Sequence, residues 1–105
     1  MKPNILIVLA DQQQAALRKA AGYPLDTMPR LDAFGRENCD FSWAYTPNPT
    51  CGPARCSMFT GRFASAHRVR TNHNMADACY SKDLIDVLKE AGYQTALCGK
   101  NHIYR

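Results

Sequence analysis

The feature that most constrains the fold is an uninterrupted aliphatic run near the start of the chain. Residues 5–10 read Ile-Leu-Ile-Val-Leu-Ala, with no polar residue among them. A strand with one face in water alternates apolar and polar side chains, whereas a continuous run is typical of a strand covered on both faces in a parallel sheet. The run therefore predicts an α/β fold with a strand over residues 4–10. Asp11 follows directly, at the strand end where open α/β sheets place their ligand sites.

Helices are predicted at three places after this strand. Residues 13–23 predict a short helix that ends near Gly22, and Pro29 marks the first turn of a second helix that ends before Gly35. The clearest pattern covers residues 81–92, where Ser81 is a candidate N-cap and Gly92 the stop signal. Its apolar stripe consists of Leu84, Ile85, Leu88 and Ala91.

Two further strands complete the predicted α/β pattern. Residues 39–45 place Phe41, Trp43 and Tyr45 on one side, which indicates a half-buried strand whose aromatic side chains belong to the core. Residues 93–98 follow the helix at 81–92 and predict a strand that returns to the sheet.

The chemistry concentrates in residues 51–62, which read Cys-Gly-Pro-Ala-Arg-Cys-Ser-Met-Phe-Thr-Gly-Arg. Pro53 suits the first turn of a helix, because its missing N–H costs nothing there. Cys51 then sits just ahead of the helix, where the dipole favours an anion. Arg55, one turn on, adds a cation with forked donors. The alternative interpretation is an ordinary helix start with a buried thiol and surface arginines.

This stretch resembles the signature of the type I sulfatases, Cys-x-Pro-x-Arg followed by Thr-Gly-Arg. In that family the cysteine is oxidised after synthesis to formylglycine, whose hydrated aldehyde is the nucleophile. The resemblance implies that Cys51 is the precursor of formylglycine and needs a formylglycine-generating maturation enzyme. It also implies that Arg55 holds the resulting diol.

A second motif supports the resemblance. Residues 91–102 read Ala-Gly-Tyr-Gln-Thr-Ala-Leu-Cys-Gly-Lys-Asn-His, similar to the family pattern Gly-Tyr-x-Thr-x-x-x-Gly-Lys-x-His. The resemblance implies that Lys100 contacts the sulfate and that His102 bonds the second hydroxyl of the diol. Asn101 stands where the family usually has an aromatic residue. Residues 63–74 resemble the family loop with His-x-x-x-x-N, which here either shapes the pocket or is a solvated loop.

The resemblance also implies a divalent metal, with Ca²⁺ the expected ion. Family members carry calcium-binding acids directly after the first strand, which points to Asp11. Many have two consecutive acids there, whereas this chain has Gln12 second. Gln12 offers only a neutral carbonyl oxygen, which a hard cation holds less strongly. The implied metal ligands are Asp11, Gln12 and the modified Cys51, and further ligands belong to segments beyond residue 105.

Charge, cysteines and hydropathy limit the partners. The net charge of +4 and the basic cluster of Arg55, Arg62, Arg68 and Arg70 favour an anionic partner, either a small sulfate or phosphate ester or a polyanion. The resemblance implies a small sulfate ester or a sulfated saccharide. Nucleic acid is not expected, because the basic cluster lacks interleaved aromatic residues. Five cysteines without a regular spacing predict no disulfide framework. The apolar run at the start is too short for a signal peptide or a membrane span, so the chain as written predicts a cytoplasmic protein, or a periplasmic or secreted one if a signal was removed.

Sulfatases are several times longer than 105 residues, so the resemblance implies that residues 1–105 are the N-terminal fragment of a sulfatase catalytic domain in the alkaline phosphatase superfamily. The implied fold is the N-terminal part of a mostly parallel sheet flanked by helices. Alone, such a fragment is expected to bind metal weakly, to turn over little substrate and to be open to oligomerisation.

Three alternatives remain open. One is a phosphonate or phosphate monoester hydrolase of the same superfamily, and another is a non-catalytic anion-binding fragment. The third is a zinc module formed by Cys51, Cys56, Cys98 and His102, although the spacings Cys-x4-Cys and Cys-x3-His do not form a standard pair of knuckles.

Overall fold

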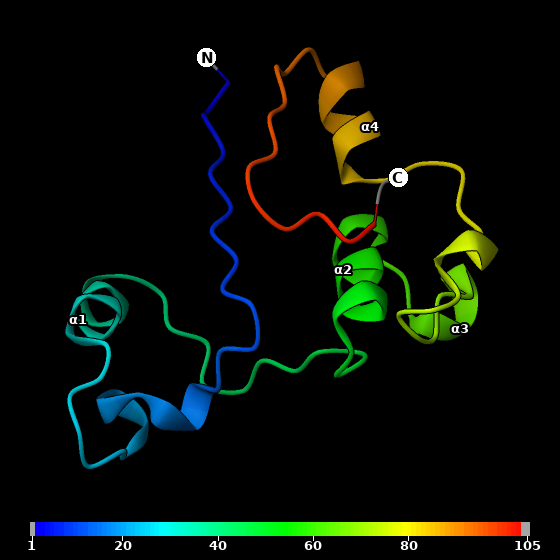
Figure 1. Ribbon diagram of the computed structural model, residues 1–105. Coiled ribbons are helices and arrows are strands. Elements are labelled where there is room, and N and C mark those ends of the chain that lie inside the picture. Colours follow the sequence, from blue (N-terminus) through cyan, green and yellow to red (C-terminus); the bar gives the residue numbers. More distant parts are fainter. Residues whose placement is uncertain (1, 104–105) are drawn as a thin grey trace. The chain divides into compact units, whose positions relative to one another are not determined.

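The computed structural model describes residues 2–103 and divides the chain into two compact units, residues 1–44 and residues 45–105 (Figure 1). Each unit is built from short helices joined by irregular segments. Within residues 2–103 no helix is long and apolar enough to cross a bilayer.

The three predicted strands are wrong for this part of the chain, because no residue from 2 to 103 lies in a strand. Residues 4–10 run as an extended segment, and their side chains are exposed, with Leu6 at 87% and Val8 at 85% (Figure 1). A strand needs neighbours to pair its N–H and C=O groups. The described residues supply none to the predicted strands at 4–10, 39–45 and 93–98, so the sheet of the predicted α/β fold is absent here.

The aromatic side chains of residues 39–45 follow the same pattern. Phe41, Trp43 and Tyr45 are all at least 76% exposed, so the prediction that they belong to the core is wrong for the described residues. Aliphatic and aromatic side chains are usually buried in folded proteins, so this exposure of residues 4–10 and 39–45 is unusual.

The first unit contains two 3₁₀ turns, η1 (Ala15–Leu17) and η2 (Lys19–Ala21), and one helix, α1 (Pro29–Glu37). The single helix predicted over residues 13–23 is therefore wrong. Arg18 lies between the two turns in an extended conformation, with φ −86° and ψ 140°, which interrupts the helix. The start of the second helix at Pro29 is confirmed, but that helix continues through Gly35 to Glu37.

Arg18 holds this first unit together. Its Nε lies 2.8 Å from Oδ1 of Asp32 on α1, and its Nη2 lies 3.0 Å from Oδ2 of Asp40. The backbone N–H of Ala20 donates to Oδ2 of Asp32 at 3.1 Å. The hydrogen bond from Arg18 is the main cause that lowers the pKa of Asp32 below its ordinary value. Arg18, whose extended backbone interrupts the predicted helix, thus links the segment of the two 3₁₀ turns to α1 through its side chain.

The second unit contains α2 (Cys51–Thr60), α3 (Ala64–His67), η3 (Met75–Asp77) and α4 (Leu84–Glu90). The helix α2 packs against both α3 and α4 and supplies most of the buried residues (Figure 1). Cys56 on α2 and Val69 after α3 are fully buried. Gly61 ends α2 in the left-handed conformation, with φ 66°, and its N–H donates to the carbonyl of Ser57 at 2.8 Å.

The helix α4 begins later than predicted. Asp83, not Ser81, is its N-cap: Oδ1 of Asp83 accepts from the N–H groups of Ile85 at 2.8 Å and Asp86 at 3.1 Å. Asp86 returns the interaction, because its Oδ2 accepts from the N–H of Asp83 at 3.1 Å. This reciprocal pair is a capping box, and it satisfies donors that a serine two residues earlier does not reach.

This cap predicts a difference between two neighbouring substitutions. Asp83→Ala in the full-length protein is expected to lower the free energy of unfolding by about 1 kcal/mol, because two helix N–H groups lose their acceptor. Ser81→Ala is the matched control and should leave stability within about 0.5 kcal/mol. Denaturant unfolding checks both variants, and a larger loss in Ser81→Ala than in Asp83→Ala would contradict the assignment of the cap.

Candidate active site

The helix α2 places Cys51 and Arg55 one turn apart in the second unit. Cys51 is the first residue of α2, not the residue ahead of it as predicted, and Thr50 is the N-cap, with φ −92° and ψ 140°. Cys51 carries a free thiol and is half-buried, whereas Arg55 is only 8% exposed. A group at position 51 therefore lies at the positive end of the helix dipole, as the sequence indicates for an anion.

Arg55 connects α2 to the second sequence motif. Its Nη1 donates a hydrogen bond to the backbone carbonyl of Lys100 at 2.6 Å, across 45 residues of sequence. A guanidinium that is almost fully buried needs such acceptors, because burial without them is costly. The structure therefore brings the backbone of the Lys100 segment to the signature helix, while the Lys100 side chain is exposed.

His102, in the same unit, combines a positive backbone φ with a buried polar side-chain atom. Its backbone is left-handed, with φ 58°, and its Nδ1 atom is buried without a hydrogen-bond partner among residues 2–103. A positive φ at a non-glycine residue costs energy, and so does a buried polar atom without a partner. Strained backbone conformations cluster at functional sites, so His102 stays a candidate.

The predicted metal ligands belong to different units of the chain. Asp11 and Gln12 are exposed residues of the first unit, and Gln12 has a φ of 56°, whereas Cys51 belongs to the second unit. The oxygen donors of Asp11 and Gln12 suit a hard cation such as Ca²⁺, which takes six or more oxygens. However, no group of three or more His, Cys, Asp or Glu side chains within residues 2–103 is arranged to hold a metal ion. The zinc alternative formed by Cys51, Cys56, Cys98 and His102, which all lie in the second unit, therefore has no cluster among the described residues to support it.

A buried hydrogen-bonded pair, Ser57 and His67, joins α2 to α3. Nε2 of His67 lies 2.8 Å from Oγ of Ser57, and both residues are at most 5% exposed. The N–H of Val69 donates to Nδ1 of His67 at 3.2 Å. We therefore assign the proton to Nε2, which donates to Ser57. Burial is the main cause that lowers the pKa of His67.

The predicted loop at 63–74 is partly wrong in detail, because residues 64–67 form α3 and His67 is buried. The rest of the loop contacts the start of α2. Oδ1 of Asn72 accepts from the N–H of Gly52 at 2.8 Å. The sequence contained a signal for both residues, the spacing His-x-x-x-x-N, but it did not show which atoms they contact.

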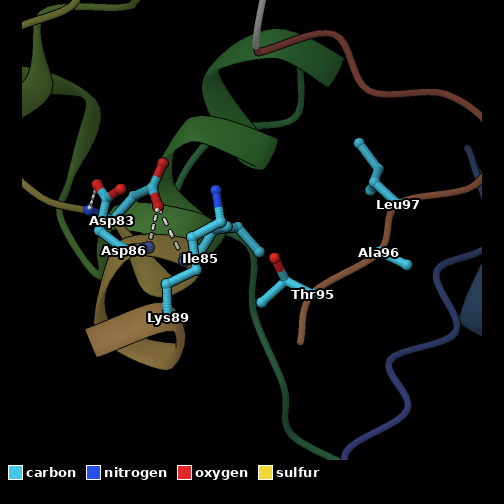
Figure 2. A pocket seen from close by; sticks show the side chains of 7 residues that line it. All are labelled: Asp83, Ile85, Asp86, Lys89, Thr95, Ala96 and Leu97. Carbon is cyan, nitrogen blue, oxygen red and sulfur yellow. Dashed lines mark hydrogen bonds between the residues drawn. The ribbon is translucent and has the colours of Figure 1, made fainter. Parts of the chain in front are cut away.

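A cavity of about 280 Å³ lies elsewhere in the second unit, between α4 and the segment that follows it. Figure 2 shows Ile85 and Lys89 of α4 on one side of it and Thr95 and Leu97 on the other. None of the predicted site residues lines this cavity. The candidate active site is therefore the first turn of α2 with the 100–102 segment, not this cavity.

This arrangement of a helix start, a buried guanidinium and a neighbouring lysine segment is one that suits an anionic group. A family model for sulfatases matches residues 3–104. The chain therefore belongs to the sulfatase family, of which it represents the N-terminal portion.

Individual relatives agree with this assignment. The chain is 31% identical to an arylsulfatase of Clostridium perfringens, over 99% of this chain and 22% of that protein. It is 36% identical to a choline-sulfatase of Rhizobium meliloti, over 96% of this chain and 20% of the relative. An N-acetylgalactosamine-6-sulfatase of Canis lupus familiaris is 31% identical, over 96% of this chain and 22% of its own length. The chain thus spans about a fifth of these relatives. No solved structure matches it significantly.

The buried His67 predicts a stability that depends on pH. Because its folded pKa is lowered, the contribution is fully present above the ordinary histidine pKa of about 6.5 and is lost as the pH falls toward the lowered value. The free energy of unfolding of the full-length protein should therefore fall as the pH is lowered through the ordinary histidine value of about 6.5.

His67→Gln should flatten this pH dependence, since glutamine keeps one donor and one acceptor but does not titrate. His73→Gln is the matched control at an exposed histidine and should leave the slope unchanged. Equal slopes in the wild type and His67→Gln would contradict the role given to His67.

Proposed function

We propose that the protein is a sulfuric ester hydrolase, a sulfatase that releases sulfate from an organic sulfate ester through a formylglycine derived from Cys51. The observation that carries the proposal is the position of Cys51 as the first residue of α2, one turn from the buried Arg55 that bonds to Lys100. Relatives are named as sulfatases of aryl esters, choline and N-acetylgalactosamine. The proposed substrates are small sulfate esters or sulfated saccharides.

The residues of this chain contribute mainly electrostatics. A sulfate ester is an anion, so any nucleophile that approaches it meets repulsion unless cations surround the sulfuryl oxygens. Position 51 lies at the positive end of the α2 dipole, and Arg55, one turn further along α2, adds a fixed positive charge. Lys100 is exposed and supplies an ammonium from the adjoining segment. Together they favour the binding of an anion at the start of α2.

His102 is the proposed proton-transfer residue. An imidazole can both accept and donate a proton, which suits His102 to hold or move a proton at the group on position 51. The buried Nδ1 atom of His102 has no hydrogen-bond partner among residues 2–103, and this supports the proposal because a group outside that range is then needed to satisfy it.

Formylglycine, once formed at position 51, supplies a hydrated aldehyde as a nucleophile that a thiol does not provide. We further propose that a divalent metal, Ca²⁺, is held in the full-length protein by Asp11, with Gln12 and residue 51 as additional ligands. The ion would supply positive charge and orient oxygen ligands. Because residues 2–103 lack a complete set of ligands, the remaining ones have to come from outside this part of the chain.

The proposal predicts the chemical state of residue 51. Mass spectrometry of the tryptic peptide of the full-length protein, produced together with a formylglycine-generating enzyme, should show an aldehyde in place of the Cys51 thiol. The same preparation should hydrolyse an aryl sulfate, whereas Cys51→Ala should have no activity above background.

Esters of one phenol separate this function from its rival. Faster hydrolysis of the phosphate or phosphonate than of the sulfate would replace the proposal with a phosphoester hydrolase. An intact thiol in an active preparation would remove formylglycine from the proposal.

The activity should fall even after a conservative substitution of Arg55. Arg55→Lys keeps the charge but loses the fork that reaches the Lys100 carbonyl, so kcat/KM for the sulfate ester is expected to fall by about 10²-fold. Arg70→Lys is the matched control, because Arg70 is exposed and lies outside the signature. Steady-state kinetics of the full-length enzyme measure both. A loss in Arg70→Lys as large as in Arg55→Lys would contradict a specific role for Arg55.

A further inference from the structure

We propose that Asn72 is a positioning residue that fixes the orientation of residue 51 through the backbone of Gly52. The inference rests on the proposed function, because it assigns Asn72 a role in placing the nucleophile. The signature at residues 51–62 does not include Asn72, which lies twenty residues after Gly52.

The first step is the contact at the start of α2. The early N–H groups of a helix have no partner inside the helix and need acceptors from elsewhere. Thr50 provides no side-chain cap, and the first backbone bond runs from the N–H of Ala54 to the carbonyl of Thr50 at 2.9 Å. The N–H of Gly52 instead donates to Oδ1 of Asn72 at 2.8 Å. Asn72 thus caps the start of α2, although it lies in a loop twenty residues further along the sequence than Gly52.

The second step is how closely the loop approaches Gly52. A Cβ atom at Gly52 would lie 2.9 Å from Sδ of Met75 and 3.0 Å from Oδ1 of Asn72. Both distances are shorter than ordinary van der Waals contact, so a side chain here would push the loop away. Gly52 is buried, and its backbone packs directly against the loop that carries Asn72.

The third step is the rigidity of this loop. Oδ1 of Asn74 accepts from the N–H groups of Arg70 at 3.0 Å and Thr71 at 2.9 Å, and its Nδ2 donates to the carbonyl of Arg68 at 2.9 Å. The base of the loop is closed by the N–H of Cys79, which donates to the carbonyl of His67 at 2.9 Å. His67 is itself bonded to Ser57 of α2. The loop is therefore held at both ends and at its centre.

The consequence follows from the planarity of the peptide bond. The N–H of Gly52 lies in the same rigid plane as the Cα and carbonyl of Cys51. Fixing the direction of this N–H therefore fixes one side of residue 51 and limits the direction of its Cα–Cβ bond. A misplacement of about 1 Å in a reacting group can cost about 10²-fold in rate. Loss of the Asn72 contact is therefore expected to lower the turnover rate.

Kinetics of the full-length enzyme test this role. Asn72→Ala should lower kcat for a sulfate ester by about 10-fold to 100-fold, with KM changed by less than about threefold and with the same formylglycine fraction at position 51. Asn38→Ala is the matched control, because it removes an asparagine bond to the backbone carbonyl of Phe34 in the other unit. An unchanged kcat, or a loss confined to KM, would overturn the proposal.

Hydrogen exchange provides a readout that does not depend on activity. In the full-length protein, the Gly52 amide should exchange slowly in the wild type and in Asn72→Asp, which keeps an acceptor oxygen, and faster in Asn72→Ala. The Ala54 amide, bonded to Thr50, should stay slow in all three. A fast Gly52 amide in the wild type would overturn the contact. Slow exchange in a protein without sulfatase activity would instead leave the contact standing and refute the proposed function.

Discussion

The hydrogen bond from Arg55 to the carbonyl of Lys100 is the interaction on which the site depends. It joins two segments that are 45 residues apart in the sequence, and it gives the buried guanidinium of Arg55 a hydrogen-bond acceptor. Without this bond, an almost fully buried cation would lose an acceptor, and the segment that carries Lys100 and His102 would lose a tie to α2. One charged side chain therefore serves both as part of the electrostatic surroundings of residue 51 and as the link between the two motifs.

The helix α2, which begins at Cys51, is held by contacts along its length, and this suits a helix that carries a catalytic position. Arg55 binds the 100–102 segment, Asn72 binds the N–H of Gly52, and Ser57 binds the buried His67. Each contact comes from a different segment of the second unit and involves a buried or half-buried group. Reacting groups have to be held within a fraction of an ångström, so contacts on several sides of residue 51 are more useful than one strong contact.

The local signals in the sequence were the most successful predictors. Pro29 marks the first residue of α1, and Pro53 lies in the first turn of α2, because the placement of a proline acts within a few residues. The predicted strands failed in residues 2–103, since a strand requires neighbours that a local pattern does not supply. The cap of α4 shifted from Ser81 to Asp83 because two acids three residues apart form a reciprocal box. The Asn72 and His67 contacts depend on tertiary packing, which no local spacing reveals.

The central claim is that the start of α2, Arg55 and the 100–102 segment form one anion site. The most direct measurement is a crystal structure of the full-length protein, matured at position 51, with inorganic sulfate. The predicted result is a sulfate ion beside residue 51 that contacts the Lys100 ammonium. A sulfate ion bound elsewhere, with residue 51 packed away from solvent, would contradict this account.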